Sequence, residues 1–97
     1  LSIAAPQPPG PPTLHPPTVA PGNTVTVSWT PGAGGVPSSY TLIARSAPAG
    51  PVIAQFARSA TTVTFGGVPG GTYFLQVIAH NAVGSSGVSN QVTVAVP

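Results

Sequence analysis

Apolar and hydroxylated residues alternate strictly between positions 24 and 30, where the sequence reads TVTVSWT. A period of two residues is typical of a β-strand that buries one face, and Val and Thr both favour strands. Similar short runs recur along the chain, separated by Gly, Pro, Ser and Asn clusters that are typical of turns. They predict seven strands, over residues 13–15, 24–30, 39–45, 52–57, 61–65, 72–80 and 88–96. Since no window has a sustained helical period, the sequence predicts an all-β fold, an antiparallel β-sandwich.

The inward positions of these strands supply a single hydrophobic core. A chain of 97 residues has room for one such core and not for two. In the strand over 72–80, for example, Tyr73, Leu75 and Val77 share one face. The predicted core residues are Trp29, Tyr40, Leu42, Val63, Phe65, Tyr73, Leu75, Val77 and Val94.

The beginning of the chain has a different composition, because the first 21 residues contain eight of the 14 prolines. The stretch PQPPGPP at 6–12 has no periodicity and is typical of a stiff polyproline II segment. We therefore predict that residues 1–12 are a Pro-rich linker or the tail of a preceding strand, and that residues 13–97 are the folded domain. Prolines on both sides of residues 13–15 restrict that stretch to a short edge strand.

The first six residues, LSIAAP, match the last six, VTVAVP, position by position at an offset of 91 residues. Two interpretations are open. In a tandem array, residues 1–5 are the end of the preceding domain's last strand. In an assembly, they pair with a sheet edge of a neighbouring copy, and Leu1 and Ile3 are the edge-pairing residues. The array is favoured because it needs no new interface.

Four separated motifs resemble fibronectin type III domains, namely VTVSWTP at 25–31, SYTL at 39–42, VPGGTY at 68–73 and VIAHNAVG at 77–84. The likeness extends over residues 11–97, although Val68 stands where the family usually has Leu. It implies a seven-stranded antiparallel immunoglobulin-like β-sandwich. It also implies that Tyr73 is a tyrosine corner, whose hydroxyl bonds to upstream backbone. Some members of the family carry an integrin-binding Arg-Gly-Asp sequence in the loop that corresponds to 81–87. This loop has neither Arg nor Asp, so that function is not carried over.

The resemblance makes the strands over 39–45 and 72–80 neighbours in one sheet. On the outward face of that sheet, the alternation then places Ile43 near Phe74 and Ile78, beside Arg45. Three large apolar side chains in one cluster favour a protein-contact patch. The alternative is that they are ordinary surface apolar residues without a role.

The chain has little chemistry for catalysis, because it contains no Asp, Glu, Lys, Cys or Met. Glycoside hydrolysis needs two carboxylates, a Ser-His-acid triad needs its acid, and thiol catalysis needs a thiol. His15 and His80 are too few for a metal site of three or four ligands. The composition therefore predicts no enzyme, no catalytic residue, no metal and no cofactor. We expect both histidines to be exposed, and Arg45 and Arg58 to be solvated charges.

The same composition restricts the partners and the location. Two arginines cannot neutralise a phosphate backbone, so we expect no nucleic-acid partner. No apolar run reaches the roughly 20 residues of a membrane-spanning helix, so we expect no membrane insertion. Only 2% of the residues are charged, which favours association and indicates a larger assembly or a crowded extracellular layer. The Thr-, Ala-, Gly- and Val-rich composition also resembles type III modules of bacterial secreted or surface proteins. We therefore expect an extracellular or cell-surface location.

Three functions are consistent with these observations. The leading hypothesis is a non-catalytic module that acts as a structural spacer or protein-interaction domain in a larger extracellular or cell-surface protein. Its partners would be other protein domains or copies of itself. The second is a self-assembling subunit of an extracellular fibre, sheath or surface layer. The third and least favoured is a polysaccharide-binding accessory module, because glycan binding uses aromatic platforms and Trp29 is predicted to be buried.

Overall fold

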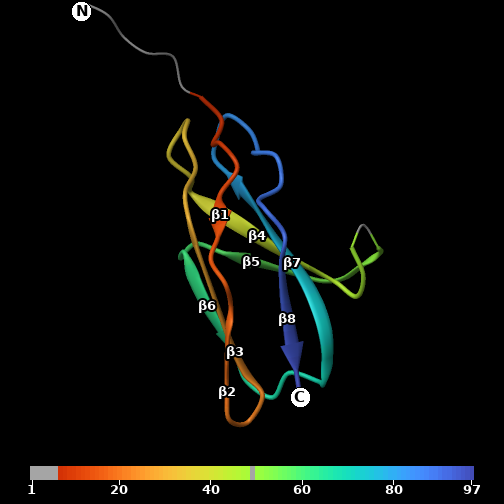
Figure 1. The fold of residues 1–97 in the computed structure, drawn as a ribbon. Helices are drawn as coiled ribbons and strands as arrows, with labels where there is room; N and C mark the ends of the chain where they lie inside the picture. Colours follow the sequence, from red (N-terminus) through yellow and green to blue (C-terminus); the bar gives the residue numbers. More distant parts are fainter. Residues whose placement is uncertain (1–6, 49) are drawn as a thin grey trace, which may run out of the picture.

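The computed structural model describes residues 7–48 and 50–97 and arranges them as two antiparallel sheets packed face to face (Figure 1). In the first sheet, β3 pairs with β1, β2 and β6. In the second, the strand order is β5-β4-β7-β8. The strands are β1 (Thr13–Leu14), β2 (Thr18–Ala20), β3 (Thr24–Thr30), β4 (Ser39–Arg45), β5 (Val52–Arg58), β6 (Thr62–Phe65), β7 (Gly71–His80) and β8 (Val92–Val96). The sequence therefore predicted the fold class correctly.

The strand count differs by one from the prediction, because the first strand is divided. Pro16 and Pro17 have no N–H to donate and interrupt its ladder. The part before them pairs Leu14 with Trp29, and the part after them, β2, pairs Val19 with Val25 on the same side of β3. The additional strand is β2, because the predicted first strand ended at residue 15.

The last strand begins at Val92 and not at residue 88. In the segment before it, Ser89 takes over the pairing with β7 through both its backbone and its side chain. Its N–H donates to the Val77 carbonyl at 2.9 Å, and its hydroxyl accepts from the Val77 N–H at 2.8 Å. A serine side chain therefore replaces part of a strand ladder here.

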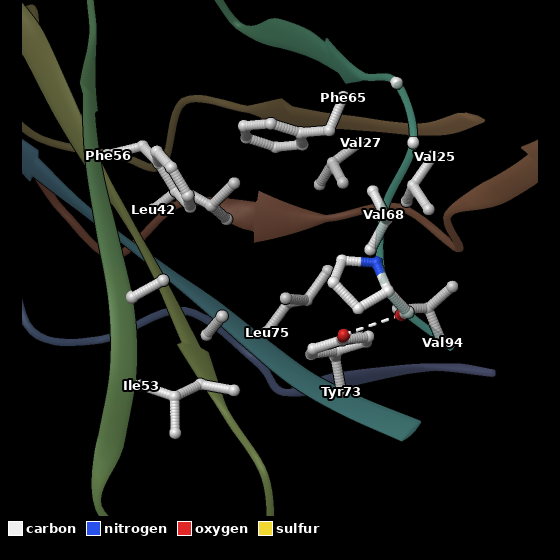
Figure 2. A pocket seen from close by; sticks show the side chains of 15 residues that line it. Val25, Val27, Leu42, Ile53, Phe56, Phe65, Val68, Tyr73, Leu75 and Val94 are labelled. Atoms are coloured by element: carbon white, nitrogen blue, oxygen red, sulfur yellow. Dashed lines mark hydrogen bonds between the residues drawn. The ribbon is translucent and has the colours of Figure 1, made fainter. Parts of the chain in front are cut away.

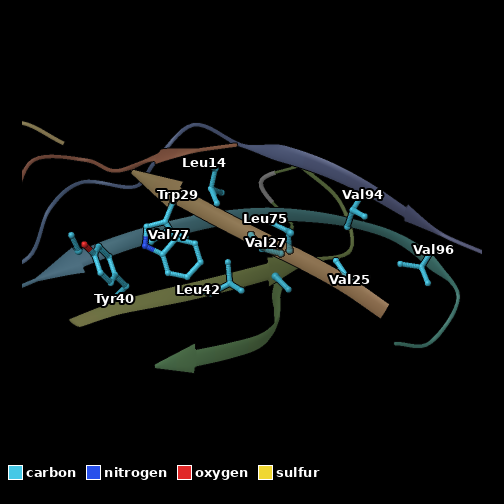
Figure 3. Packing of buried hydrophobic residues seen from close by; sticks show 12 residues of the cluster. Leu14, Val25, Val27, Trp29, Tyr40, Leu42, Leu75, Val77, Val94 and Val96 are labelled. Atoms are coloured by element: carbon cyan, nitrogen blue, oxygen red, sulfur yellow. The ribbon is translucent and has the colours of Figure 1, made fainter. Parts of the chain in front are cut away.

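The core lies between the two sheets (Figure 3). Its most deeply buried large side chains are Val27, Leu42 and Val77. Trp29 packs edge-on against Tyr40, with ring centroids 5.5 Å apart. Six predicted core residues are buried, namely Trp29, Tyr40, Leu42, Leu75, Val77 and Val94. The other three, Val63, Phe65 and Tyr73, are partly buried and pack against that cluster.

The two long sides of the sandwich, where a strand of one sheet lies beside a strand of the other, are built differently. On the side of β1, β2 and β8, which we call the closed seam, Asn90 reaches across from one sheet to the other. Its Oδ1 accepts from the Leu14 N–H at 2.7 Å, and its Nδ2 donates to the Leu14 carbonyl at 3.1 Å. At the far end of the same seam, Asn23 Nδ2 donates to the carbonyls of Val68 and Pro97, each at 3.1 Å. The opposite side, between β5 and β6, we call the open seam.

Candidate functional site

The central residue of the predicted contact patch on the outer face of β4 and β7 is buried. Ile43 is only 5% exposed, so the exposed position expected for it is wrong. It lies outside the core cluster and stands opposite Gln55 on β5 and Gln76 on β7. The neighbouring strands therefore flank it on both sides. Phe74 and Ile78, the other two apolar members of the predicted patch, are half-buried.

Arg45 does not behave as a freely solvated charge. Its Nε donates to the Gly50 carbonyl at 3.1 Å, and its guanidinium also donates to the side chain of Gln76. These bonds hold the side chains of Arg45 and Gln76 on the outer face beside Ile43. The apolar stems of such long side chains cover apolar neighbours. This face is better described as a fixed polar cover than as an apolar contact patch.

His80 is also bonded on both ring nitrogens. Its Nε2 lies 2.8 Å from the Thr41 hydroxyl on β4, and its Nδ1 lies 2.7 Å from the Ser85 hydroxyl in the loop after β7. The two bonds connect the loop after β7 to β4 through the His80 ring. The sequence contains no Asp or Glu side chain that could orient this imidazole as a base. His15 is exposed and bonds to the Thr30 hydroxyl at 2.7 Å. Within residues 7–48 and 50–97, no three His, Cys, Asp or Glu side chains gather as metal ligands.

The open seam contains an apolar cavity of about 360 Å³ between the edges of the two sheets (Figure 2). Phe56 and Phe65 lie side by side at its wall, with their ring centroids 4.7 Å apart. The Arg58 guanidinium lies over both rings. Tyr73 lines the cavity too, but its hydroxyl donates to the Pro69 carbonyl at 2.7 Å. The Tyr73 hydroxyl in the lining therefore already has a hydrogen-bond partner within the protein. The alternation of apolar and polar residues does not predict this cavity. The only signal in the sequence is the pair Gly66-Gly67, which contributes no side chains to close the seam.

The third candidate surface is the pole at which the described chain begins, in the red segment (Figure 1). Residues 7–12, which we call the docked segment, contact the loops over 31–36 and 81–87, which we call the pole loops. Pro9 forms an antiparallel bridge with Gly34, and the Gly35 N–H donates to the Pro8 carbonyl at 3.1 Å. Pro9 and Pro12 are buried. Residues 7–12 were predicted to precede the domain, but the structure places them against it.

Asn81 joins the docked segment to both pole loops. Its Nδ2 donates to the Gln7 carbonyl at 2.8 Å and to the Val36 carbonyl at 3.4 Å. Its Oδ1 accepts from the backbone N–H groups of Val83 and Gly84 at 2.9 and 3.2 Å. Both the NH₂ group and the carbonyl oxygen of the Asn81 side chain are thus hydrogen-bonded to backbone groups. These bonds fix which way the amide points.

Leu1 and Ile3, the predicted edge-pairing residues, lie outside the described residues and stay a prediction. Burial in the core raises the pKa of the Tyr40 phenol above the ordinary value of 10.0. The described residues contain no helix with the length and hydropathy needed to cross a membrane.

Comparison with known proteins gives structural relatives only. No family model and no curated protein matches the chain. The twitchin kinase region from C. elegans (Fn31-NL-kin-CRD-Ig26) matches with a TM-score of 0.78 and 26% identity over 92% of this chain, which spans 17% of that protein chain. An Fn3-like protein from Clostridium thermocellum matches with a TM-score of 0.68 and 23% identity over 97% of this chain and 96% of that one. Domains A168–A170 of titin match with a TM-score of 0.64 and 20% identity, over 94% of this chain and 32% of that one.

Proposed function

Since the chain is a fibronectin type III domain by its fold, we propose that it is a non-catalytic module of a larger extracellular or cell-surface protein. In this proposal it acts as a structural spacer or protein-interaction domain, and its partners are other protein domains or copies of itself. It needs no cofactor for that role.

The observation that carries the spacer role is the position of the two ends of the described chain. The described chain begins at one pole of the sandwich, in the red segment, and ends at the other pole, where C marks the end of the chain (Figure 1). The molecule measures 56 × 25 × 18 Å along its principal axes. The two ends of the described chain therefore lie at opposite ends of its long dimension (Figure 1). A module of this kind adds its length to an array each time it is repeated.

Two further observations support the proposal. Matches in twitchin and titin occupy only a part of those longer chains, so this fold is used there beside other domains. The charged fraction of 2% supports a location in an assembly or a crowded extracellular layer, because such a surface repels its neighbours weakly.

A tandem polypeptide of two copies joined end to end tests the spacer role by small-angle X-ray scattering. We expect the maximum dimension to increase by close to one further module length over the 56 Å of a single copy. A pair that folds back side by side, with little increase in its maximum dimension, would reject the spacer role. The single chain at the same mass concentration is the control.

The second candidate, a self-assembling subunit, is favoured by the open seam. In the part of the chain that the structure describes, β5 pairs only with β4, so its other edge is unpaired. That edge carries Val52 and Ile53, which are 40% and 50% exposed, beside the apolar cavity. An unpaired apolar edge is a site for strand addition from a neighbouring copy. Sedimentation over a range of micromolar concentrations decides, since a monomer at every concentration contradicts assembly.

The polysaccharide-binding role has the least support. Trp29 and Tyr40 are 3% and 4% exposed, so neither provides an aromatic platform for a sugar ring. Pull-down on cellulose and chitin tests the role, and we expect no retention.

A further inference from the structure

The docked segment is rich in prolines, and this restricts how it can bind. Residues 7–12 read QPPGPP, so most of them have no backbone N–H and can only accept hydrogen bonds. A surface that holds such a segment must supply donors. The pole loops supply two, the Gly35 N–H to the Pro8 carbonyl and the Asn81 Nδ2 to the Gln7 carbonyl. The hydrogen-bonding chemistry of the two surfaces is therefore complementary.

The shape of the two surfaces is complementary as well, because glycines let the backbones approach closely. A Cβ added to Gly32 would lie 2.1 Å from the Pro11 carbonyl oxygen, and one added to Gly35 would lie 1.9 Å from that of Gln7. From the other side, a Cβ added to Gly10 would lie 1.9 Å from the Ala33 carbonyl oxygen. Real Cβ atoms do not approach backbone to these distances, so each of these positions requires glycine.

The direction of the Asn81 amide is set independently of the docked segment. The two turn N–H groups of Val83 and Gly84 bind its Oδ1, which leaves Nδ2 facing Gln7. The donor is therefore in place before the segment binds. A proline-rich segment also loses little conformational entropy on ordering, because the φ angle of each proline is already fixed.

We propose that the pole loops form a socket for residues 7–12, which makes this pole a rigid joint. The joint fixes the position and direction of the backbone at Gln7 relative to the domain. In the proposed array, the joint orients the neighbouring folded domain on this side. Only the presence of that neighbouring domain rests on the proposed function. The same docking covers the pole loops and leaves them less surface for other partners.

Double electron–electron resonance measures this rigidity directly. The sequence has no cysteine, so Gln7→Cys and Ala95→Cys provide two unique positions for spin labels, one in the segment and one on β8. We expect a narrow distance distribution in the parent protein. In Gly10→Ala and Gly32→Ala we expect the distribution to become at least about twofold broader as the segment leaves the socket. The matched control is Gly66→Ala, because a Cβ there meets nothing within 4 Å, and its distribution should equal the parent's.

A third variant removes a side-chain donor of the pole loops and keeps the acceptor for the turn. Asn81→Asp keeps an oxygen for the N–H groups of Val83 and Gly84 but removes the Nδ2 donor, which bonds to Gln7 at 2.8 Å and to Val36 at the longer distance of 3.4 Å. We expect the Gly35 amide to exchange with solvent about tenfold faster in this variant, because its hydrogen bond to Pro8 opens with the segment.

A broad distribution in the parent protein, or a narrow one in Gly10→Ala, would overturn the proposal. Gly10 lies on the segment, outside the sandwich, so this result stands even if Gly32→Ala fails to fold. The outcome is independent of the scattering experiment on two copies. A tandem pair that folds back rejects the spacer role, whereas the rigid joint would still be seen in the single chain.

Discussion

The two long sides of this sandwich show how differently the same pair of sheets can be finished. At the closed seam, Asn90 and Asn23 bind backbone groups of the opposite sheet or of the chain end. At the open seam, aromatic rings line a cavity of about 360 Å³, and β5 keeps an unpaired edge. The lesson is that apolar side chains fill the space between sheets, but polar side chains close its margin. Four experiments test this comparison, in order of decreasing effect.

The largest effect is expected in the core close to the closed seam. Trp29→Ala removes a side chain that is 3% exposed and should cost about 3–5 kcal/mol in the free energy of unfolding. Phe65→Ala, at the wall of the open seam, should cost about half as much, because its ring is already partly in water. Urea unfolding measures both values. Equal losses would mean that the open seam is as well packed as the core.

Asn90→Ala should open the closed seam. It leaves the N–H and the carbonyl of Leu14 without the partners they have in the native protein, and we expect a loss of about 1–3 kcal/mol in the free energy of unfolding. Gln91→Ala is the control, since this side chain follows Asn90 in the chain but is exposed, and it should change the value by less than about 0.5 kcal/mol. If both variants unfold at the same urea concentration, Asn90 does not close the seam.

Filling the cavity should stabilise the open seam by a smaller amount. Ala54 lines the cavity, so Ala54→Leu adds apolar volume where space exists and should gain about 0.5–1 kcal/mol in the free energy of unfolding. Ala57→Leu, on the exposed face of the same strand, should gain nothing. Thermal melting compares the two variants, and a melting temperature for Ala54→Leu below that of the parent would show that the cavity cannot accept a larger side chain.

The last effect is absent at neutral pH and develops only in alkali. The two tyrosines divide between the regions, since Tyr40 is buried against Trp29 and Tyr73 lines the open seam. Burial raises the pKa of Tyr40 above 10.0, so its contribution to stability is complete below pH 10. Above that pH the unfolded chain loses the proton first, and stability falls as the pH rises toward the pKa of the folded state.

Urea unfolding between pH 8 and 11 should therefore show a decline in the parent that is smaller in Tyr40→Phe. A decline of the same size in Tyr40→Phe would assign the alkaline loss to other groups. Tyr73→Phe is the comparison variant, because it removes the hydrogen bond to the Pro69 carbonyl and should already lower stability at neutral pH.

Most of the strands could be read from the sequence, because a period of two fixes which side chains share a face. The pattern of β3 and the alternation of β7 put Val27 and Val77 inside, as observed. The same rule went wrong at Ile43. It gave the face correctly but not the exposure, which depends on how Arg45, Gln55 and Gln76 are arranged on adjacent strands. Alternation along one strand contains no information about the cover provided by its neighbours.

The proline-rich segment illustrates the same limit. Its composition predicted stiffness, and prolines do restrict its backbone. Whether such a segment extends into solvent or docks depends on what lies beside it, and two loops far apart in the sequence provide the donors and the glycines. Composition describes the segment alone, whereas docking is a property of two surfaces.

The sequence by itself determined the class of fold, the inward faces of the strands and the absence of acid, thiol and lysine chemistry. These depend on residue type and on spacing within a few positions, which short-range sterics and hydrophobicity translate directly into local structure. Only the tertiary structure decided which seam is closed, where a cavity remains and where residues 7–12 lie. Those outcomes rest on contacts such as that of Leu14 with Asn90, 76 residues apart, and such contacts exist only once both sheets have packed.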